Sequence, residues 1–192
     1  MIETAPPTAK KLWTEAELEA LPEDGYIHEV VDGELVMSPK NNYEHGEMCS
    51  ALLIALGTHA KLHKLGAVWD SSTGFWMHNR NCRAPDVSFI SKSRLKGLKR
   101  SGRQFFPGAP DLEVEVLAPS YRPADITERL KDFFSSGTQL AWVVHPEEQY
   151  VEVCHSPTKR QILGPGADLR GIPPRARDRG GARTCASADD ES

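Results

Sequence analysis

The chain has 192 residues and a mass of 21.2 kDa, which is enough for one domain with a sizeable core and short for two. Hydrophobic residues make up 39% and charged residues 26% of the sequence, as in ordinary globular proteins. The formal net charge of -4 argues against a protein that coats nucleic acid indiscriminately. No apolar run approaches the ~20 residues of a membrane span, so we expect a cytoplasmic protein without membrane contact.

The chain has four scattered cysteines, Cys49, Cys82, Cys154 and Cys185. Their positions show neither the close paired spacing of a zinc site nor the density of a disulfide-rich scaffold. We therefore expect reduced, ordinary thiols.

The N-terminal part combines a loose end, a short helix and a hairpin. Residues 1–11 are polar and contain prolines, so we expect a flexible N-terminus. Thr14 and Glu17 have the spacing of a capping box, which predicts that a helix begins after Thr14. Two strand-prone runs follow within residues 26–37, and the Asp32-Gly33 pair between them indicates a tight turn.

The rest of the chain alternates between helical and strand patterns. The predicted helices are residues 45–64 and 126–136, and the predicted strands lie within residues 67–77, 85–90, 110–120, 140–144 and 150–154. This order predicts one α/β domain over residues 12–164, with a mixed central sheet flanked by helices. Residues 165–192 lack apolar periodicity and carry five arginines, so we expect a disordered C-terminal tail.

Residues 110–120 carry acid on one face of a predicted strand. Side chains alternate between the two faces of a strand. A row of like charges spaced two residues apart is repulsive and needs a cation, a proton or open water. The two faces consist of Leu112, Val114 and Val116 on one side and Asp111, Glu113, Glu115 and Leu117 on the other.

Three acids, Glu29, Asp86 and Glu115, come from different predicted strands. Hard divalent cations prefer oxygen ligands, and phosphodiester hydrolases use them to orient a water molecule and to neutralise phosphate charge. Acids on a solvated sheet face give the same pattern. The residues alone leave both interpretations open.

Two groups of basic side chains offer further candidates. Residues 92–103 hold six basic residues and no acidic one, so Lys96, Lys99 and Arg100 are candidates for contact with DNA phosphates, with a solvated loop as the alternative. His59 and His63 lie at i and i+4 of a predicted helix and are weak candidates for zinc. No third ligand is evident nearby, so we expect solvated histidines.

Seven motifs are distributed over residues 12–164. They are Leu21-Pro22-Glu23-Asp24-Gly25-Tyr26, Glu29-Val30-Val31-Asp32-Gly33-Glu34-Leu35-Val36-Met37-Ser38-Pro39, His45-Gly46, Arg83-Ala84-Pro85-Asp86-Val87, Gly108-Ala109-Pro110-Asp111-Leu112, Val114-Glu115-Val116-Leu117-Ala118-Pro119-Ser120 and Trp142-Val143-Val144. Together they resemble the Uma-two family of restriction-endonuclease-like proteins, a branch of the PD-(D/E)XK nuclease superfamily.

The resemblance implies a restriction-endonuclease-like core that acts on DNA. It implies that Asp86 and Glu115 hold Mg²⁺ or Mn²⁺, that Glu29 is a further ligand or the base that orients water, and that His45 borders the site as a further candidate for DNA contact. The family's chain continues as an apolar strand after the equivalent of Gly166. The Arg-rich tail therefore indicates a shifted reading frame or a divergent extension.

Three positions depart from the family pattern. Glu113 stands where an apolar residue is usual, His145 stands where Asp is usual, and Arg129 stands where the family places the superfamily's lysine. Arginine keeps the positive charge, but its planar fork is a poor substitute for an ammonium group that positions water. The alternative for Arg129 is a solvated helix residue paired with Asp125 or Asp132.

Two functions follow from this resemblance. The first is a metal-dependent DNA endonuclease with Glu29, Asp86, Glu115 and Arg129 as its candidate catalytic residues. The second is a catalytically impaired, DNA-binding or structural relic of the same fold. A hydrolase that uses Glu29 and Glu115 as acid and base, as glycosidases do, has no evident sugar platform. A homodimer is left open.

Overall fold

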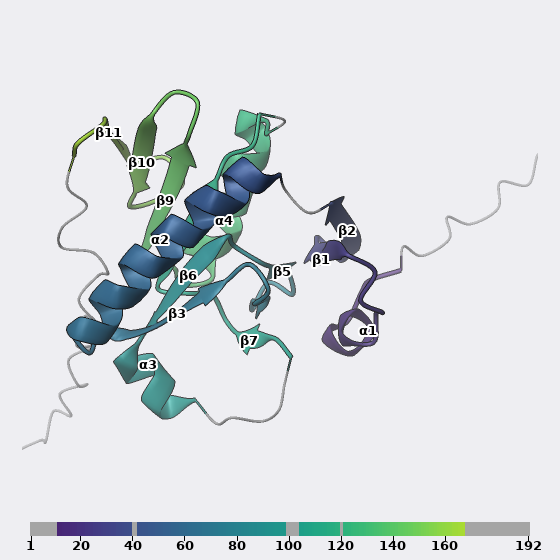
Figure 1. Cartoon of the computed structure of the whole chain (residues 1–192). Coiled ribbons are helices and arrows are strands. Elements are labelled where there is room, and N and C mark those ends of the chain that lie inside the picture. Colours follow the sequence, from purple (N-terminus) through teal and green to yellow (C-terminus); the bar gives the residue numbers. More distant parts are fainter. Residues whose placement is uncertain (1–10, 40–41, 99–103, 120, 168–192) are drawn as a thin grey trace, which may run out of the picture.

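The computed structural model describes residues 11–39, 42–98, 104–119 and 121–167 (Figure 1). The described part contains four helices and two mixed sheets, which confirms the predicted α/β class. None of its helices is long and apolar enough to cross a membrane. The helices are α1 (Glu15–Glu19), α2 (Tyr43–Leu62), α3 (Lys92–Gly97) and α4 (Pro123–Ser135).

The larger sheet has six strands, and β8 lies inside it. β8 pairs with β9 in parallel and with β6 in antiparallel orientation, and all five β8 residues are buried. A strand that is buried on both faces must find partners for any acid it carries. In order, the strands are β11 (Arg160–Leu163), β10 (Tyr150–Cys154), β9 (Leu140–His145), β8 (Leu112–Val116), β6 (Val87–Ser91) and β3 (Gly66–Asp70).

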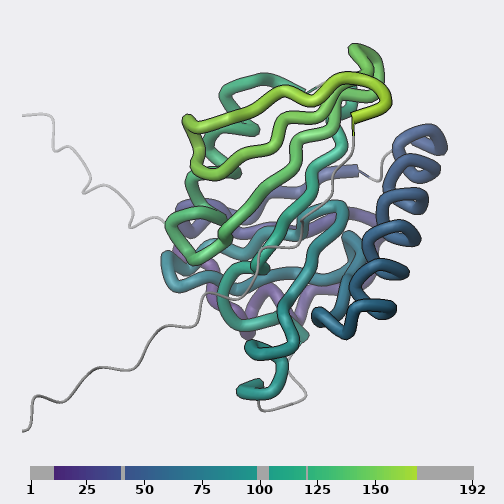
Figure 2. The backbone as a smooth tube through the Cα atoms, turned by 90° about the vertical axis from the view of Figure 1, so that its left-hand side faces the viewer, coloured from purple at the N-terminus to yellow at the C-terminus, as the bar shows by residue number. Residues whose placement is uncertain are grey.

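Helices cover both faces of this sheet. α2 follows one face, as Figure 2 shows, and buries Leu56 and Ala60 against a cluster that includes Val114. α4 covers the opposite face, where Ile126 and Leu130 pack against strand residues of β9 and β10. Since α2 contacts the Leu112, Val114 and Val116 face, the acidic face of β8 lies on the side of α4.

The smaller sheet holds the N-terminal hairpin beside the larger sheet. Its hairpin turn places Asp32 at φ 50° and Gly33 at φ 78°, as a tight hairpin turn requires. Leu18 of α1 packs against Val30 and Cys82 and so attaches the first helix. The strand order is β2 (Glu34–Pro39), β1 (Tyr26–Val31), β5 (Cys82–Arg83), β4 (Phe75–Trp76) and β7 (Phe106–Pro107).

Several predicted elements are confirmed. Thr14 and Glu17 form both hydrogen bonds of the capping box at the start of α1. The hairpin, the long helix α2, the helix α4 and the strands β6, β8, β9 and β10 lie within a few residues of their predicted positions. Local capping, turn and periodicity signals were sufficient for these elements.

Other expectations were wrong. The predicted strand over residues 67–77 is two strands, β3 and β4, because a turn over residues 71–74 separates them and sends β4 into the other sheet. The basic segment begins with the short helix α3 rather than with a loop, and β5, β7 and β11 were not predicted. Residues 1–10 of the N-terminal segment, residues 168–192 of the tail, Lys99, Arg100 and Cys185 lie outside the described residues, and the expectations for them stay predictions.

Candidate functional site

The acids of β8 are buried, so the interpretation as a solvated sheet face was wrong. Glu115 is 2% exposed and Glu113 is fully buried. Both side chains lie on the α4 face of β8, opposite the apolar residues that face α2. The negative charges of this acidic row can be compensated by a cation, a proton or open water. Burial excludes open water, so a cation or a proton must compensate them.

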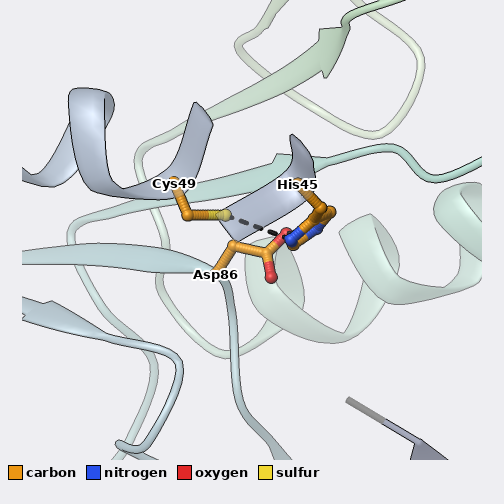
Figure 3. Close-up of side chains that lie close together, drawn as sticks. All are labelled: His45, Cys49 and Asp86. Atoms are coloured by element: carbon orange, nitrogen blue, oxygen red, sulfur yellow. Dashed lines mark hydrogen bonds and ion pairs between the residues drawn. The ribbon is translucent and has the colours of Figure 1, made fainter. Parts of the chain in front are cut away.

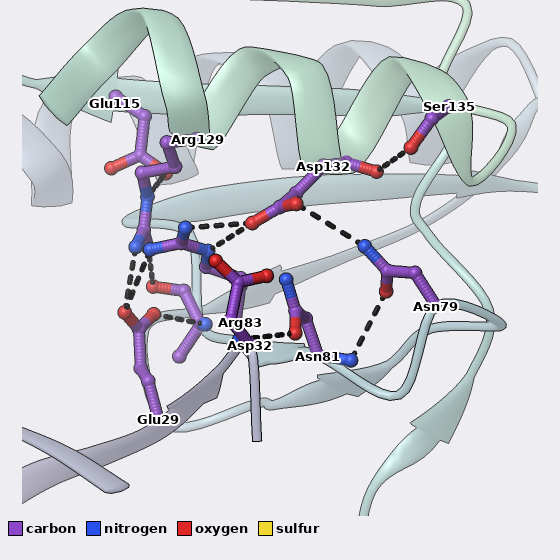
Figure 4. Close-up of polar contacts among 10 residues, drawn as sticks. Glu29, Asp32, Asn79, Asn81, Arg83, Glu115, Arg129, Asp132 and Ser135 are labelled. Carbon is purple, nitrogen blue, oxygen red and sulfur yellow. Dashed lines mark hydrogen bonds and ion pairs between the residues drawn. The ribbon is translucent and has the colours of Figure 1, made fainter. Parts of the chain in front are cut away.

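Arg129 supplies the cation (Figure 4). Its Nε donates to Glu115 Oε1 at 2.5 Å, its Nη1 to Glu29 Oε2 at 2.8 Å, and its Nη2 to the carbonyl oxygen of Ala84 at 2.7 Å. Arg129 is 7% exposed. The alternative of a solvated helix residue was therefore wrong, because one buried guanidinium joins α4, β8 and β1.

The acids that were proposed as partners of Arg129 bind other arginines. Arg122 contacts Asp125 at 2.9 Å, at the exposed start of α4. Arg83 contacts Asp132 Oδ2 through Nε at 2.8 Å and Nη2 at 2.6 Å. Arg83 lies inside the Arg-Ala-Pro-Asp motif but was not predicted as a site residue, and its pairing with Asp132 fixes β5 against α4.

Asp86 lies at the link between the two sheets. Only Ala84 and Pro85 separate it from β5, and β6 begins directly after it. Its Oδ2 accepts a hydrogen bond from Val116 N at 2.8 Å and lies 3.2 Å from His45 Nε2. The structure therefore places His45 beside Asp86, while Arg129 contacts the other two acids.

The network changes the acidity of its members. Burial alone would raise the pKa of Glu29, but the charge and hydrogen bond of Arg129, together with Arg83, hold this pKa below its usual value. Burial raises the pKa of Glu115 to about 7, with Arg129 opposing the shift and Asp86 adding to it. The hydrogen bond to Asp86 is the largest cause that raises the pKa of His45 to about 10.

Glu113 is a buried acid without a counter-ion. Among the described residues, neither of its side-chain oxygens has a hydrogen-bond partner, and Ser88, directly opposite on β6, has a buried hydroxyl in the same condition. Burial and the neighbouring charge of Glu115 raise the pKa of Glu113 well above its usual value. The raised pKa favours the protonated, neutral form of Glu113.

A cavity of about 450 Å³ opens onto the Arg129 network. Its walls include Glu29, Asp86 and Glu115, so the three predicted acids reach one cavity. Asp125 and Glu128 of α4 also line it. The cavity is therefore rich in carboxylate oxygen, which is the donor type of Mg²⁺ and Mn²⁺ sites.

The three acids do not converge on a metal position while Arg129 is bound between two of them. Within the described residues, the group of three metal-ligand side chains whose ligand atoms all lie within 4.8 Å of one another is His45, Cys49 and Asp86. The carboxylates fit Mg²⁺ in their chemistry. Their geometry fits only if the guanidinium of Arg129 gives up its contact with Glu115.

The basic segment lies farther from the site than its sequence position suggested. β6 runs from Val87, directly after Asp86, to Ser91, and a strand of five residues rises ~17 Å, so α3 begins at the far end of β6. Lys96 is exposed on α3, whereas Arg94 donates to Ala109 O at 2.7 Å and contacts Asp111 at 3.2 Å. One cation of this segment is therefore structural.

The structure also places the other histidines that the sequence singled out, the pair His59 and His63 and the single residue His145. His59 and His63 are exposed at the end of α2, with ring centroids 4.5 Å apart, and the described residues place no third metal ligand with them. His145 stacks on Tyr150 and lies 3.3 Å from Glu152, at the edge of a different cavity. Neither position belongs to the carboxylate site.

The two mixed sheets, with acids from each of them lining one cavity, form an α/β fold that is shared with a solved structure. The structure is similar to a crystal structure described as "a putative nuclease belonging to DUF820 from Anabaena variabilis ATCC 29413", with a TM-score of 0.70, 22% sequence identity, and coverage of 84% of this chain and 89% of that chain. The chain belongs to the Uma2 family, described as "Putative restriction endonuclease", whose model matches residues 15–174. No curated protein matches the chain. The family resemblance is thus confirmed.

Proposed function

We propose that this protein is a metal-dependent endonuclease that hydrolyses DNA phosphodiester bonds. The observation that carries the proposal is one cavity that brings together Glu29, Asp86 and Glu115 from separate segments of the chain. Membership of a family described as restriction endonucleases supports the same reaction class. Burial of Glu29 and Glu115, with Asp86 partly buried beside them, is costly for stability alone, which favours a functional reason for the cluster.

The metal ion would be Mg²⁺ or Mn²⁺, held by Asp86 and Glu115. Such an ion neutralises phosphate charge and lowers the pKa of bound water. Glu29 would serve as a further ligand or as the group that orients the water molecule. Arg129 would then move from Glu115 toward the substrate phosphate, where its positive charge, which lysine would also supply, offsets the charge of the phosphate.

Cleavage of plasmid DNA by the full chain, with Mg²⁺ or Mn²⁺ added, tests this function. We expect nicking or linearisation that is lost with chelator and reduced at least ~100-fold in both Asp86→Asn and Glu115→Gln, because each removes a charged ligand. Glu47→Gln, an exposed acid on α2, is the matched control and should cleave normally. Cleavage that survives both site substitutions would contradict the proposal.

The second candidate is a DNA-binding or structural relic of the fold, and the observation that favours it is the guanidinium of Arg129. It already neutralises Glu29 and Glu115, which is the task of the metal ion. It also occupies the two carboxylates that a glycosidase-like mechanism would need. The contacts of Arg129 therefore do not support a glycosidase-like hydrolase that uses Glu29 and Glu115 as acid and base.

Arg129→Lys separates the endonuclease from the relic. Lysine keeps the charge but cannot hold both carboxylates through one planar fork, so Mg²⁺ should gain access to Glu115 and cleavage should increase. Arg122→Lys, at the exposed start of the same helix, is the control. DNA binding without cleavage in the wild-type protein and in Arg129→Lys would favour the relic.

A further inference from the structure

A second set of metal-ligand side chains lies on the other side of Asp86. His45 and Cys49 are one helical turn apart on α2, and His45 Nδ1 lies 3.4 Å from Cys49 Sγ (Figure 3). One ligand atom from each of His45, Cys49 and Asp86 lies within 4.8 Å of the other two. Three different donor types, imidazole, thiol and carboxylate, therefore converge there.

The spacing of these atoms matches a tetrahedral metal site. Zinc binds imidazole nitrogen at about 2.0–2.1 Å and thiolate sulfur at about 2.3 Å, so tetrahedral geometry separates the two ligand atoms by about 3.6 Å. The observed distance between His45 Nδ1 and Cys49 Sγ is 3.4 Å. A small adjustment of the two side chains would admit the ion.

The orientation of the His45 ring is already fixed for this task. Nε2 lies 2.9 Å from the carbonyl oxygen of Val116, which can only accept, so Nε2 carries a hydrogen. Nδ1 is then the nitrogen that faces Cys49, and binding of an ion there would release the protons of Nδ1 and of the Cys49 thiol. Histidines that bind metals nearly always donate their other ring N–H to a carbonyl or carboxylate, and the carbonyl oxygen of Val116 is that acceptor here.

The site is also accessible. A cavity of about 780 Å³ is lined by His45, Cys49 and Asp86 on the side of α2 that faces the hairpin residues Tyr26 and His28. An ion that enters through it would have three protein ligands and a fourth position open to the cavity. Three ligands and an open position are the pattern of zinc sites that bind or activate a further molecule.

We propose that His45, Cys49 and Asp86 form a binding site for a borderline-soft transition metal ion such as Zn²⁺. The thiolate favours such ions over Mg²⁺, which prefers oxygen ligands. Asp86 lines this cavity and also the Glu115 cavity, so the two metals would share it. If the proposed function holds, Zn²⁺ should therefore inhibit Mg²⁺-dependent cleavage.

Titration of the full chain with Co²⁺, followed by absorption spectroscopy without DNA, tests the site directly. We expect a thiolate-to-Co²⁺ charge-transfer band that saturates at one equivalent and is displaced by Zn²⁺. Cys49→Ser should abolish the band. Loss of an outer partner of a metal ligand weakens metal binding by ~10–100-fold, so loss of a ligand itself in His45→Ala should weaken Co²⁺ binding by no less than this.

Two controls identify the source of the sulfur ligand and of the nitrogen ligand. Cys185→Ser and the double variant His59→Ala/His63→Ala should keep the band. Because Cys49→Ser could also perturb folding, alkylation of Cys49 in the unmodified chain is measured by mass spectrometry, and Zn²⁺ should slow it at least ~10-fold. Absence of the band, its survival in Cys49→Ser, or unchanged alkylation would overturn the site, whatever the cleavage assay shows.

Discussion

Arg129 shows how one side chain can set the state of a whole site. Its guanidinium makes three hydrogen bonds to groups from three segments, and its burial is tolerated because each nitrogen has an acceptor. The proximity of Glu115 and Glu29 raises the pKa of Arg129 well above its usual value, although burial opposes this. The positive charge is thus permanent, and only movement of the side chain can expose both acids.

Glu113 is the residue whose replacement should stabilise the protein. A buried carboxyl group without a hydrogen-bond partner costs ~1–3 kcal/mol, and valine would continue the apolar packing of the sheet. We expect Glu113→Val to raise the free energy of unfolding by ~1–3 kcal/mol, measured by urea denaturation. Ser88→Ala, across the strand, is the control and should have a smaller effect.

The gain from Glu113→Val should depend on pH. The folded-state pKa of Glu113 is raised above its usual value, so above pH ~4.5 the unfolded chain loses this proton while the folded chain keeps it. This linkage destabilises the wild-type protein progressively as pH rises toward the folded-state pKa. The difference between variant and wild type should therefore grow as the pH rises above ~4.5, and a constant difference would contradict the raised pKa of Glu113.

At the scale of elements, the position of β3 depends on the absence of a side chain. Gly66 begins β3 opposite Ser91 of β6, and a Cβ atom there would collide with the carbonyl oxygen of Ile90. Because backbone cannot yield as a flexible side chain can, Gly66→Ala should lower the free energy of unfolding by ~1–3 kcal/mol. Urea denaturation would measure the loss.

Gly57→Ala is the matched control for Gly66→Ala. Gly57 lies within α2, and a Cβ atom at this position has no other atom within 4 Å. Alanine is favoured over glycine inside a helix by ~1 kcal/mol, so this variant should be more stable than the wild type. Equal effects of the two substitutions would contradict the close approach of β3 to β6.

At the scale of the whole molecule, the sequence predicted those elements whose structure depends on residues close to one another along the chain. The capping box at Thr14, the turn at Asp32-Gly33 and the alternation of β8 are local patterns, and the structure contains all three. Strands of two residues, such as β4 and β5, exist only through their partners in the sheet. No local signal marks them.

The sequence predicted which acids form the candidate site, but it did not predict the contacts that these acids make. Strand position and family motifs selected Glu29, Asp86 and Glu115, which one cavity brings together. The bond between Glu29 and Arg129 spans 100 residues and depends on how two sheets and a helix pack. For Cys49 a signal did exist, since it lies four residues after His45 on a predicted helix.

The charge distribution gives the last prediction, which concerns the side of the molecule that would contact DNA under the proposed function. Residues 92–103 carry six basic side chains in a chain of net charge -4, and Lys96 projects from α3 at the end of β6 away from Asp86. A duplex on the protein surface that runs parallel to the buried strand β6 would span both regions. Each phosphate contact contributes ~0.9 to the slope of log affinity against log salt.

Replacing Lys96, Lys99 and Arg100 with Gln should therefore reduce this slope by ~2–3 if all three contact phosphate. Fluorescence anisotropy with a labelled duplex at several salt concentrations and with Ca²⁺ in place of Mg²⁺ measures it without cleavage. The triple variant Lys61→Gln/Lys64→Gln/Lys159→Gln removes the same charge from exposed positions elsewhere and should keep the slope. Equal slopes in the two variants would place DNA on another face of the protein.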